Sequence, residues 1–247
     1  MKKMVIFMGI MVAYIVLTLF VFLVLPGIIS TTIILEDNVR WTYKNHEWKV
    51  YDSDTELFGY KIYDPNNGDY IGRKDIRYYN SNWLVKEKKQ YVSYDKSMLA
   101  VKSNKFKAYG FDMTTLTDTN VINKIIAKAS VTKTGGVVIG NQIKIDLDSD
   151  GRDEIIYGIS NIDEMGNTKF YVFAIYMNGE YKIIKKYVGE NNPSVYVYAV
   201  VDVDGDSNLE LIVKESYFSM SGCDYSLYSL VDGEYTEMIS TGGSLWN

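Results

Sequence analysis

The 247-residue sequence contains one cysteine, one histidine and three prolines. A single cysteine, Cys223, excludes an intrachain disulfide, and we interpret it as a small apolar residue rather than a reactive thiol. The one histidine, His46, falls in a predicted hairpin turn, where a polar residue needs no catalytic role. The scarcity of proline, together with 22 tyrosines, favours strands over helices.

Recognisable catalytic motifs are also missing. The chain has no G-x-S-x-G, no H-E-x-x-H and no glycine loop that would hold a phosphate. The glycine-containing stretch 131–140 leads into a strand pattern, so it lacks the helix start that binds anions. We therefore expect that the protein is not an enzyme.

One long apolar run is present, from Met4 to Leu25, without a charged residue. As a helix it would be about 33 Å long, enough to cross a bilayer core of about 30 Å. Lys2 and Lys3 precede the run, which predicts a cytoplasmic N-terminus and an extracytoplasmic remainder. A cleaved signal peptide is the alternative, but its apolar part is usually about 7–15 residues and ends at small residues. We predict that residues 1–30 are an uncleaved signal anchor of a single-pass protein of the cell membrane.

The remainder of the chain has no excess of basic charge. Because Lys2 and Lys3 lie in the predicted anchor, it carries 24 Lys and Arg against 31 Asp and Glu, a net charge of −7. This balance argues against nucleic acid or anionic lipid as its main partner. Its partners are expected to be the membrane, through the anchor, and a protein or a cell-wall glycan.

Four short segments predict β-hairpins. Asn178-Gly179 and Asp232-Gly233 are the strongest signals, since these residues tolerate the positive φ of a two-residue turn. Asn67-Gly68 is a weaker example. The segment 40–51 predicts a hairpin that turns at Asn45-His46 and places Tyr43 opposite Trp48 and Lys44 opposite Glu47.

One segment predicts a helix. In 118–130, Asp118 is a capping residue, and apolar residues follow at helical spacing. These apolar residues are Val121, Ile122, Ile125, Ile126 and Ala129.

The sequence contains an internal repeat. An acidic loop begins at Asp146 and another at Asp202, and an apolar strand pattern follows each of them. The distance from loop start to hairpin turn is 32 residues in the first copy, to Asn178, and 30 in the second, to Asp232. Each unit is expected to contain one acidic loop and about four strands, the size of a propeller blade.

The acidic loops predict two calcium sites. Alternate residues of a curling loop can direct oxygen atoms inward, and position 7 can contribute its backbone carbonyl. Ca²⁺ accepts about 6–8 such oxygens, whereas Mg²⁺ requires stricter geometry and is the second choice. Positions 1, 3, 5, 7 and 9 are Asp146, Asp148, Asp150, Arg152 and Glu154 in the first loop, and Asp202, Asp204, Asp206, Asn208 and Glu210 in the second.

The acidic loops differ from three other kinds of site that contain clustered carboxylates or bound metals. An EF-hand requires a bidentate Glu at position 12 and flanking helices, but Tyr157 and Val213 occupy that position and strand patterns follow. Zinc is disfavoured because neither loop contains His or Cys. The regular spacing fits metal binding better than an acid/base pair. A solvated acidic turn without a metal remains the alternative for both loops.

The stretches DLDSDGRDEIIYG and DVDGDSNLELIVK resemble the calcium loops of FG-GAP or VCBS-type repeats, the blades of integrin-α-like β-propellers. The resemblance covers roughly residues 137–241. It implies that the D-x-D-x-D-G loop joins two strands of a blade and binds calcium for structure. The second loop departs from the pattern, with Gly205 at position 4 and Ser207 at position 6. A residue other than Gly at positive φ costs about 1 kcal/mol, so we expect a weaker second site.

These observations predict a mainly β protein. We expect an N-terminal transmembrane helix in 1–30, a β-rich region in 36–115, a helix and linker in 116–136, and two blade-like repeats in 137–247. A closed propeller needs at least four blades, and only two are identified. The region 36–109 could supply degenerate blades; an open or incomplete β-structure, or a separate N-terminal β-subdomain, is the equal alternative.

The expected function is that of a membrane-anchored, extracytoplasmic interaction module in which calcium is structural. An accessory subunit of a membrane complex is the first alternative, and a glycan-binding or glycan-processing protein of the cell wall is the second. Aromatic residues could stack on sugar rings, although core packing explains them as well. These residues are Trp41, Trp48, Tyr78, Tyr79 and Trp83.

Overall fold

The computed structural model describes residues 31–35, 40–44, 47–50, 57–79, 82–87, 90–93, 99–103, 105–189, 192–217 and 223–241. The apolar run predicted to span the membrane and the turn at Asn45-His46 lie outside these residues. Within the described ranges, no helix has the length and apolar character that a membrane crossing requires.

The protein is mainly β, as predicted, and its described residues form three antiparallel sheets, none of them closed. The N-terminal sheet has the order β3 (Glu47–Val50), β2 (Arg40–Lys44), β1 (Thr31–Ile34), β8 (Leu99–Lys102), β4 (Leu57–Tyr63), β5 (Tyr70–Tyr79), β6 (Asn82–Glu87) and β7 (Gln90–Ser93). The first repeat sheet has the order β10 (Met113–Thr115), β11 (Val137–Ile145), β12 (Glu154–Ile162), β13 (Thr168–Met177) and β14 (Glu180–Val188). The second repeat sheet has the order β18 (Glu234–Ser240), β17 (Cys223–Val231), β16 (Glu210–Ser216), β15 (Ser194–Asp202) and β9 (Lys107–Tyr109).

Each repeat is a meander of four consecutive strands, β11–β14 and β15–β18, which agrees with the predicted unit. The acidic loop joins the first and second strands in both. The short strands β9 and β10 extend the meanders, β9 beside β15 and β10 beside β11. One stretch of chain, 107–115, therefore supplies an edge strand to both repeat sheets.

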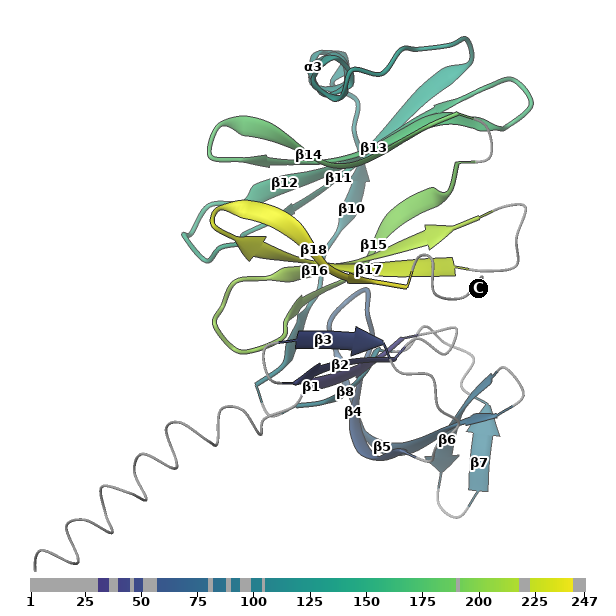
Figure 1. Cartoon of the computed structure of the whole chain (residues 1–247), viewed down its shortest axis with the longest axis vertical. Coiled ribbons are helices and arrows are strands. Elements are labelled where there is room, and N and C mark those ends of the chain that lie inside the picture. Colours follow the sequence, from purple (N-terminus) through teal and green to yellow (C-terminus); the bar gives the residue numbers. More distant parts are fainter. Residues whose placement is uncertain are drawn as a thin grey trace, which may run out of the picture.

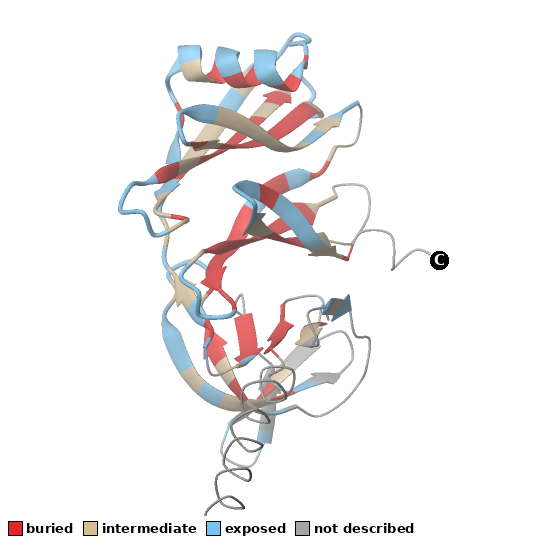
Figure 2. Ribbon diagram, turned by 60° about the vertical axis from the view of Figure 1, so that its left-hand side comes forward, coloured by how far each residue is buried: buried red, intermediate tan, exposed pale blue. Residues whose placement is uncertain are grey.

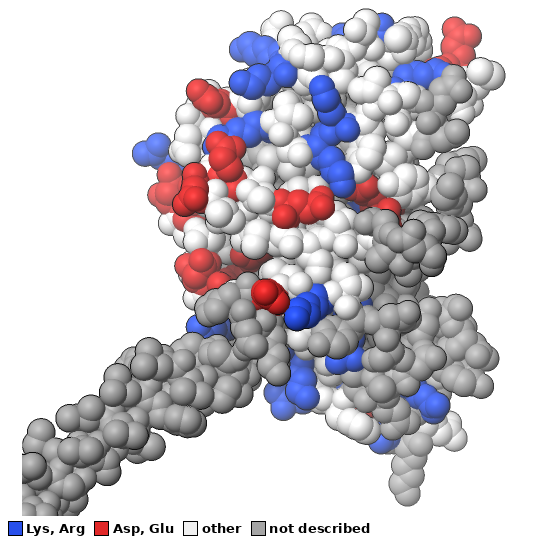
Figure 3. Space-filling view, viewed as in Figure 1, with Lys and Arg blue, Asp and Glu red and all other residues white. Residues whose placement is uncertain are grey.

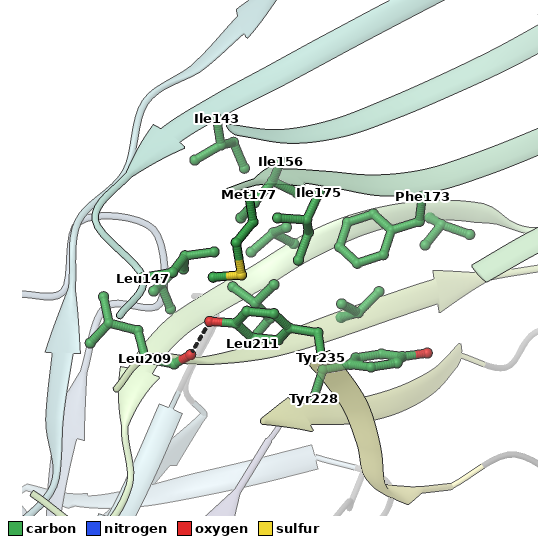
Figure 4. Close-up of a cluster of buried hydrophobic side chains, with 14 of the residues drawn as sticks. Ile143, Leu147, Ile156, Phe173, Ile175, Met177, Leu209, Leu211, Tyr228 and Tyr235 are labelled. Carbon is green, nitrogen blue, oxygen red and sulfur yellow. Dashed lines mark hydrogen bonds between the residues drawn. The ribbon is translucent and has the colours of Figure 1, made fainter. Parts of the chain in front are cut away.

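The sheets lie in a stack, with the second repeat sheet in the middle (Figure 1). Buried residues concentrate on the faces between layers (Figure 2). The cluster between the two repeat sheets includes Phe173 and Ile175 from one side and Leu211 and Tyr228 from the other (Figure 4). A second cluster joins the opposite face of the second repeat sheet to the N-terminal sheet.

Helix α3 (Thr119–Ala129) covers the outer face of the first repeat sheet. As predicted, Asp118 caps it, and its side chain accepts hydrogen bonds from the backbone N–H groups of Asn120 and Val121. The apolar side of the helix packs against sheet residues such as Ile159 and Val172. It consists of Ile122, Ile125, Ile126 and Ala129. At the other end of the stack, the curled N-terminal sheet buries its own outer cluster. Both end faces of the stack are therefore covered.

The predicted hairpins are confirmed. Met177 pairs with Glu180, and Val231 pairs with Glu234. The turn residues have positive φ, including 84° at Gly179 and 79° at Gly233. Near the N-terminus, the pairs Tyr43–Trp48 and Lys44–Glu47 form in the predicted register, and Tyr63 pairs with Tyr70 around the turn that contains Asn67-Gly68.

Gly179→Val and Gly233→Val are each expected to lower the free energy of unfolding by about 1–3 kcal/mol. Apart from the glycine itself and its two chain neighbours, no heavy atom of the described residues lies within 4 Å of the position that a Cβ would take at either glycine. The expected loss therefore comes from the positive φ, which a β-branched residue resists. Thermal unfolding of the full-length chain measures it. Gly179→Asn is the control, because Asn tolerates this conformation. Equal melting temperatures for all variants would contradict the turn assignment.

The aromatic residues considered for sugar stacking take different positions. Trp41 is fully buried in the cluster between the N-terminal and second repeat sheets, so it belongs to the core. Trp48 packs against the same cluster, and its ring centroid lies 5.1 Å from that of Tyr43. The side chains of Tyr78, Tyr79 and Trp83 lie outside the described residues.

Polar contacts also join the two repeat sheets. The Lys185 Nζ on β14 lies 2.6 Å from Glu215 Oε1 on β16, and the Glu215 side chain is 3% exposed. The hydroxyls of Tyr187 and Tyr217 donate hydrogen bonds to the other carboxylate oxygen of Glu215. Nearer the hairpin turns, Lys182 Nζ lies 2.7 Å from Glu234 Oε1, at an exposed position. Lys185 Nζ also lies 3.5 Å from Glu237 Oε2 on β18. Strand β14 of the first repeat is thus joined to β16 of the second by a buried ion pair and to β18 by more exposed ones.

Candidate metal centre

Two loops form the candidate site. The first acidic loop, Asp146–Glu154, connects β11 to β12, and the second acidic loop, Asp202–Glu210, connects β15 to β16. Both project on the left in Figure 1, and Figure 3 shows Asp and Glu side chains gathered on that side. A strand follows each loop, which excludes the flanking helices of an EF-hand, as predicted.

The two loops have the same pattern of backbone conformation. Positive φ occurs at positions 4 and 6 in both, with φ 59° at Ser149 and 86° at Gly151, and 80° at Gly205 and 73° at Ser207. Each loop therefore places one Gly and one Ser in the left-handed region, in opposite order. The expected weakness of the second loop relied on strain at Ser207. Ser149 carries the same strain, so strain at Ser207 does not make the second loop weaker than the first, and that expectation is wrong in its reason.

The glutamates at position 9 make equivalent contacts. The Leu147 N–H donates to Glu154 Oε2 at 2.8 Å, and the Val203 N–H donates to Glu210 Oε2 at 2.9 Å. Both carboxylates are buried, at 5% and 6% exposure. Each glutamate therefore closes its loop by holding the N–H at position 2.

In the first acidic loop, carboxylate oxygens of Asp146, Asp148 and Glu154 lie within 4.8 Å of one another. The Asp146 carboxylate accepts hydrogen bonds from the N–H groups of Asp150 and Gly151, at 3.1 and 3.0 Å. The carboxylate of Asp150 is outside this cluster and accepts from the Arg152 N–H at 2.8 Å. The side chain of Arg152 lies 4.0 Å from Asp150 Oδ2 and is 86% exposed, so only its carbonyl remains a candidate ligand.

In the second acidic loop, carboxylate oxygens of Asp202, Asp204 and Asp206 lie within 4.8 Å of one another. Glu210 is outside this cluster, because its other oxygen accepts a hydrogen bond from the Ser229 hydroxyl at 3.1 Å. Asn208 donates from its N–H and its side chain to Asp206, both at 2.8 Å. As for Arg152, the carbonyl of Asn208 is its candidate ligand.

Asp202 is the most informative residue of the site. Its side chain is fully buried, and its Oδ1 accepts a hydrogen bond from the Gly205 N–H at 2.6 Å. Its Oδ2 is also buried and accepts no hydrogen bond from any described part of the chain. A buried carboxylate oxygen without a partner is strongly unfavourable unless a cation compensates it. A cation among Asp202, Asp204 and Asp206 would supply that compensation.

Burial, with crowded negative charge as a smaller cause, shifts the pKa values of three loop carboxylates upward. Burial raises the pKa of Glu210 to about 8, although hydrogen bonds from Val203 and Ser229 oppose the shift. Burial also raises the pKa of Glu154, and the nearby aspartates of its loop add to this. The pKa of Asp204 is raised by burial and by the charge of Asp206. The raised pKa values show that burial and mutual repulsion disfavour the charged form of these carboxylates, and a bound divalent cation would offset both effects.

The donor set restricts the kind of cation. Carboxylate and carbonyl oxygens are the ligands of Ca²⁺ and Mg²⁺, while neither loop offers the nitrogen or sulfur that zinc prefers. Three clustered carboxylates and one loop carbonyl leave further positions for water at each site. Ca²⁺ stays the predicted ion, because it accepts variable numbers of oxygens in flexible geometry.

The sequence did not predict that the two loops touch. The Leu209 N–H donates to the Leu147 carbonyl at 2.8 Å, and the Ser149 hydroxyl donates to the Ser207 carbonyl at 2.6 Å. Figure 4 shows Leu147 and Leu209 at one end of the shared core, where the Tyr235 hydroxyl donates to the Leu209 carbonyl at 2.7 Å. The one signal of this contact in the sequence was Ser149, which stands at position 4 of the first loop where the second loop has Gly.

Comparison of this chain with family models, with curated proteins and with solved structures found no match.

Proposed function

We propose that this chain is a calcium-binding β-repeat protein that acts as an extracytoplasmic interaction module. The observation that carries the proposal is that Asp202, one of three clustered carboxylates, has a buried Oδ2 with no hydrogen-bond partner among the described residues. The equivalent loop of the other repeat has the same backbone pattern and the same closing contact from its glutamate. Calcium would hold both loops in shape and so stabilise one edge of the stacked repeats.

The resemblance to FG-GAP or VCBS-type repeats supports this proposal. In that family the acidic loop joins two strands of a blade, and in this chain each loop joins the first two strands of a four-stranded meander. The stack of open sheets differs from a closed propeller. We infer that the repeats are blade-like units in an open arrangement, with one end covered by α3 and the other by the N-terminal sheet.

The apolar run Met4–Leu25, with Lys2 and Lys3 before it, supports a membrane anchor and an extracytoplasmic position for the repeats. Calcium concentrations outside the cytoplasm suit loops with Kd of roughly 10⁻⁴ to 10⁻³ M. Exposed loops on a rigid scaffold commonly carry binding function, so the partner is expected to be a protein or a cell-wall glycan.

Isothermal titration calorimetry tests the proposal. Calcium chloride is titrated into the full-length chain in detergent micelles. We expect two bound ions per chain with Kd of roughly 10⁻⁴ to 10⁻³ M. Asp202→Asn should remove one of them, because it removes a ligand charge without changing the shape of the side chain. Glu164→Gln, at an exposed turn between β12 and β13, is the matched control and should retain both. A chain that binds no calcium would contradict the proposal.

A further inference from the structure

The direct contact between the two acidic loops has a consequence for the ions that they bind. In the second acidic loop, the carbonyl of Asn208 is the candidate ligand at position 7. The same peptide group carries the Leu209 N–H, which donates to the Leu147 carbonyl in the first acidic loop at 2.8 Å. Leu147 lies between Asp146 and Asp148, two members of the first carboxylate cluster. A single peptide group therefore connects the two candidate sites.

A second hydrogen bond joins the loops at their strained positions. Ser149 has φ 59° and its hydroxyl donates to the Ser207 carbonyl at 2.6 Å. At position 4 of the other loop, Gly205 takes the left-handed conformation without this cost. The Ser149 side chain thus provides a contact that a Gly there could not. The Ser207 side chain has no equivalent role, because only its carbonyl takes part.

Leu147 also links the contact to the closing glutamate. Its N–H donates to Glu154 Oε2 at 2.8 Å, while its carbonyl accepts from Leu209. Both leucines are buried in the core between the repeat sheets, at 0% and 4% exposure. The Leu147–Leu209 hydrogen bond is thus anchored by buried side chains, whereas the Ser149–Ser207 hydrogen bond lies at exposed positions. Through these two bonds, a change in one loop must be accommodated by the other.

We propose that the two acidic loops form one coupled pair, in which a divalent cation bound by one loop increases the affinity of the other for a second. This inference rests on the proposed calcium function. Occupancy of one loop fixes its peptide groups, and the two inter-loop hydrogen bonds then hold the neighbouring loop in its binding shape. The second ion avoids part of the ordering cost that the first ion met.

Electrostatic effects between the two sites oppose this coupling. The first loop carries five carboxylates and one Arg, and the second carries four carboxylates. The first divalent cation removes two of these negative charges and so weakens the attraction for the second ion, but the pair stays negative and continues to attract it. Repulsion between the two ions opposes the coupling but is screened at physiological salt, where the Debye length is about 8 Å.

Site-specific titration tests the coupling. The full-length chain, labelled with ¹⁵N-glycine and held in detergent micelles, is titrated with calcium chloride. The Gly151 amide signal reports the first loop and the Gly205 signal reports the second. In Asp202→Asn, the midpoint for Gly151 is expected to move to about tenfold higher calcium, within the range of roughly 5- to 150-fold for coupled sites.

Two serine variants separate contact from charge, because neither changes the charge of the loops. Ser149→Gly keeps the positive φ but removes the hydroxyl that bridges the loops. The calcium midpoints of the Gly151 and Gly205 signals should therefore move apart. Ser207→Gly relieves the same strain and keeps the bridging carbonyl, so its midpoints should stay together as in the unmodified chain.

The outcomes distinguish two failures. Two independent curves that are unaffected by Asp202→Asn or Ser149→Gly would overturn the coupling and leave the calcium function standing. If neither glycine signal of the unmodified chain responds to calcium, both the coupling and the proposed function are overturned.

Discussion

Replacing Lys185 with methionine is expected to lower the free energy of unfolding by about 3 kcal/mol. Lys185 on β14 pairs with Glu215 on β16, and only 3% of the Glu215 side chain is exposed. Methionine keeps the apolar stem but removes the ammonium group, which leaves the buried carboxylate without a counter-charge. Hydrogen bonds from Tyr187 and Tyr217 remain, so we expect the lower end of the usual range of about 3–5 kcal/mol.

Lys182→Met is the matched control. Lys182 is also on β14 and also contacts the second repeat, but its partner Glu234 is 65% exposed. Exposed ion pairs contribute about 0–1 kcal/mol. The melting temperature of the full-length chain should therefore fall by about 6–12 °C in Lys185→Met and by only a few degrees in Lys182→Met. The double variant Lys185→Met/Glu215→Gln should recover most of the loss. Equal shifts in both lysine variants would show that the buried pair does not hold the repeat sheets together.

The same pair gives a dependence on pH. Burial of the ammonium group opposes its charge, but the hydrogen bond and the charge of Glu215 outweigh burial and raise the pKa of Lys185. A raised pKa in the folded state means that the contribution is complete below the unfolded value of about 10.4 and is lost as pH rises through the folded value. The difference between Lys185→Met and the unmodified chain should therefore hold from neutral pH to about pH 10 and shrink above it.

Local features of this fold could be predicted from the sequence because they depend on neighbouring residues. Asp118 and the apolar residues after it specify helix α3, and the Asn-Gly and Asp-Gly pairs specify two hairpins. The repeat with its acidic loops follows from spacing alone. Each of these features is decided by side chains within a few positions of one another.

Features that depend on distant pairing were not predictable. The pairing of β1 with β8 joins Ile33 to Val101, and no local pattern specifies such a partner. The same is true of β9 and β10, whose few residues complete two different sheets. Within the site, spacing identified the loops but not which carboxylates converge. Asp150 and Glu210 make hydrogen bonds with the chain instead of joining the clusters, and their partners become visible only in the folded loops.

Calcium is expected to stabilise the folded chain by about 1.4 kcal/mol per loop at about ten times Kd, from the linkage relation RT ln(1 + [L]/Kd). Two loops then contribute about 2.8 kcal/mol. Without the ion, the buried Oδ2 of Asp202 has no hydrogen-bond partner among the described residues, and the carboxylates of each loop repel one another. The apolar clusters between the sheets do not depend on the loops, so the chain should remain folded at 25 °C in chelator.

Both loops should contribute to this stabilisation. Asp148→Ala removes a carboxylate from the first cluster and Asp204→Ala removes the equivalent one from the second. Since each loop carries one strained serine, we expect comparable losses of the calcium effect. Asp206→Ala should behave as Asp204→Ala does, while Asp150→Ala should have a smaller effect, because Asp150 lies outside the first cluster.

The most direct test is the melting temperature of the full-length chain in chelator and in about 10 mM calcium. A gain of about 6–11 °C with calcium is expected, with a smaller gain in magnesium and none when Asp148→Ala and Asp204→Ala are combined. Identical melting temperatures in chelator and in calcium would contradict the account, and the loops would then be acidic turns without a metal.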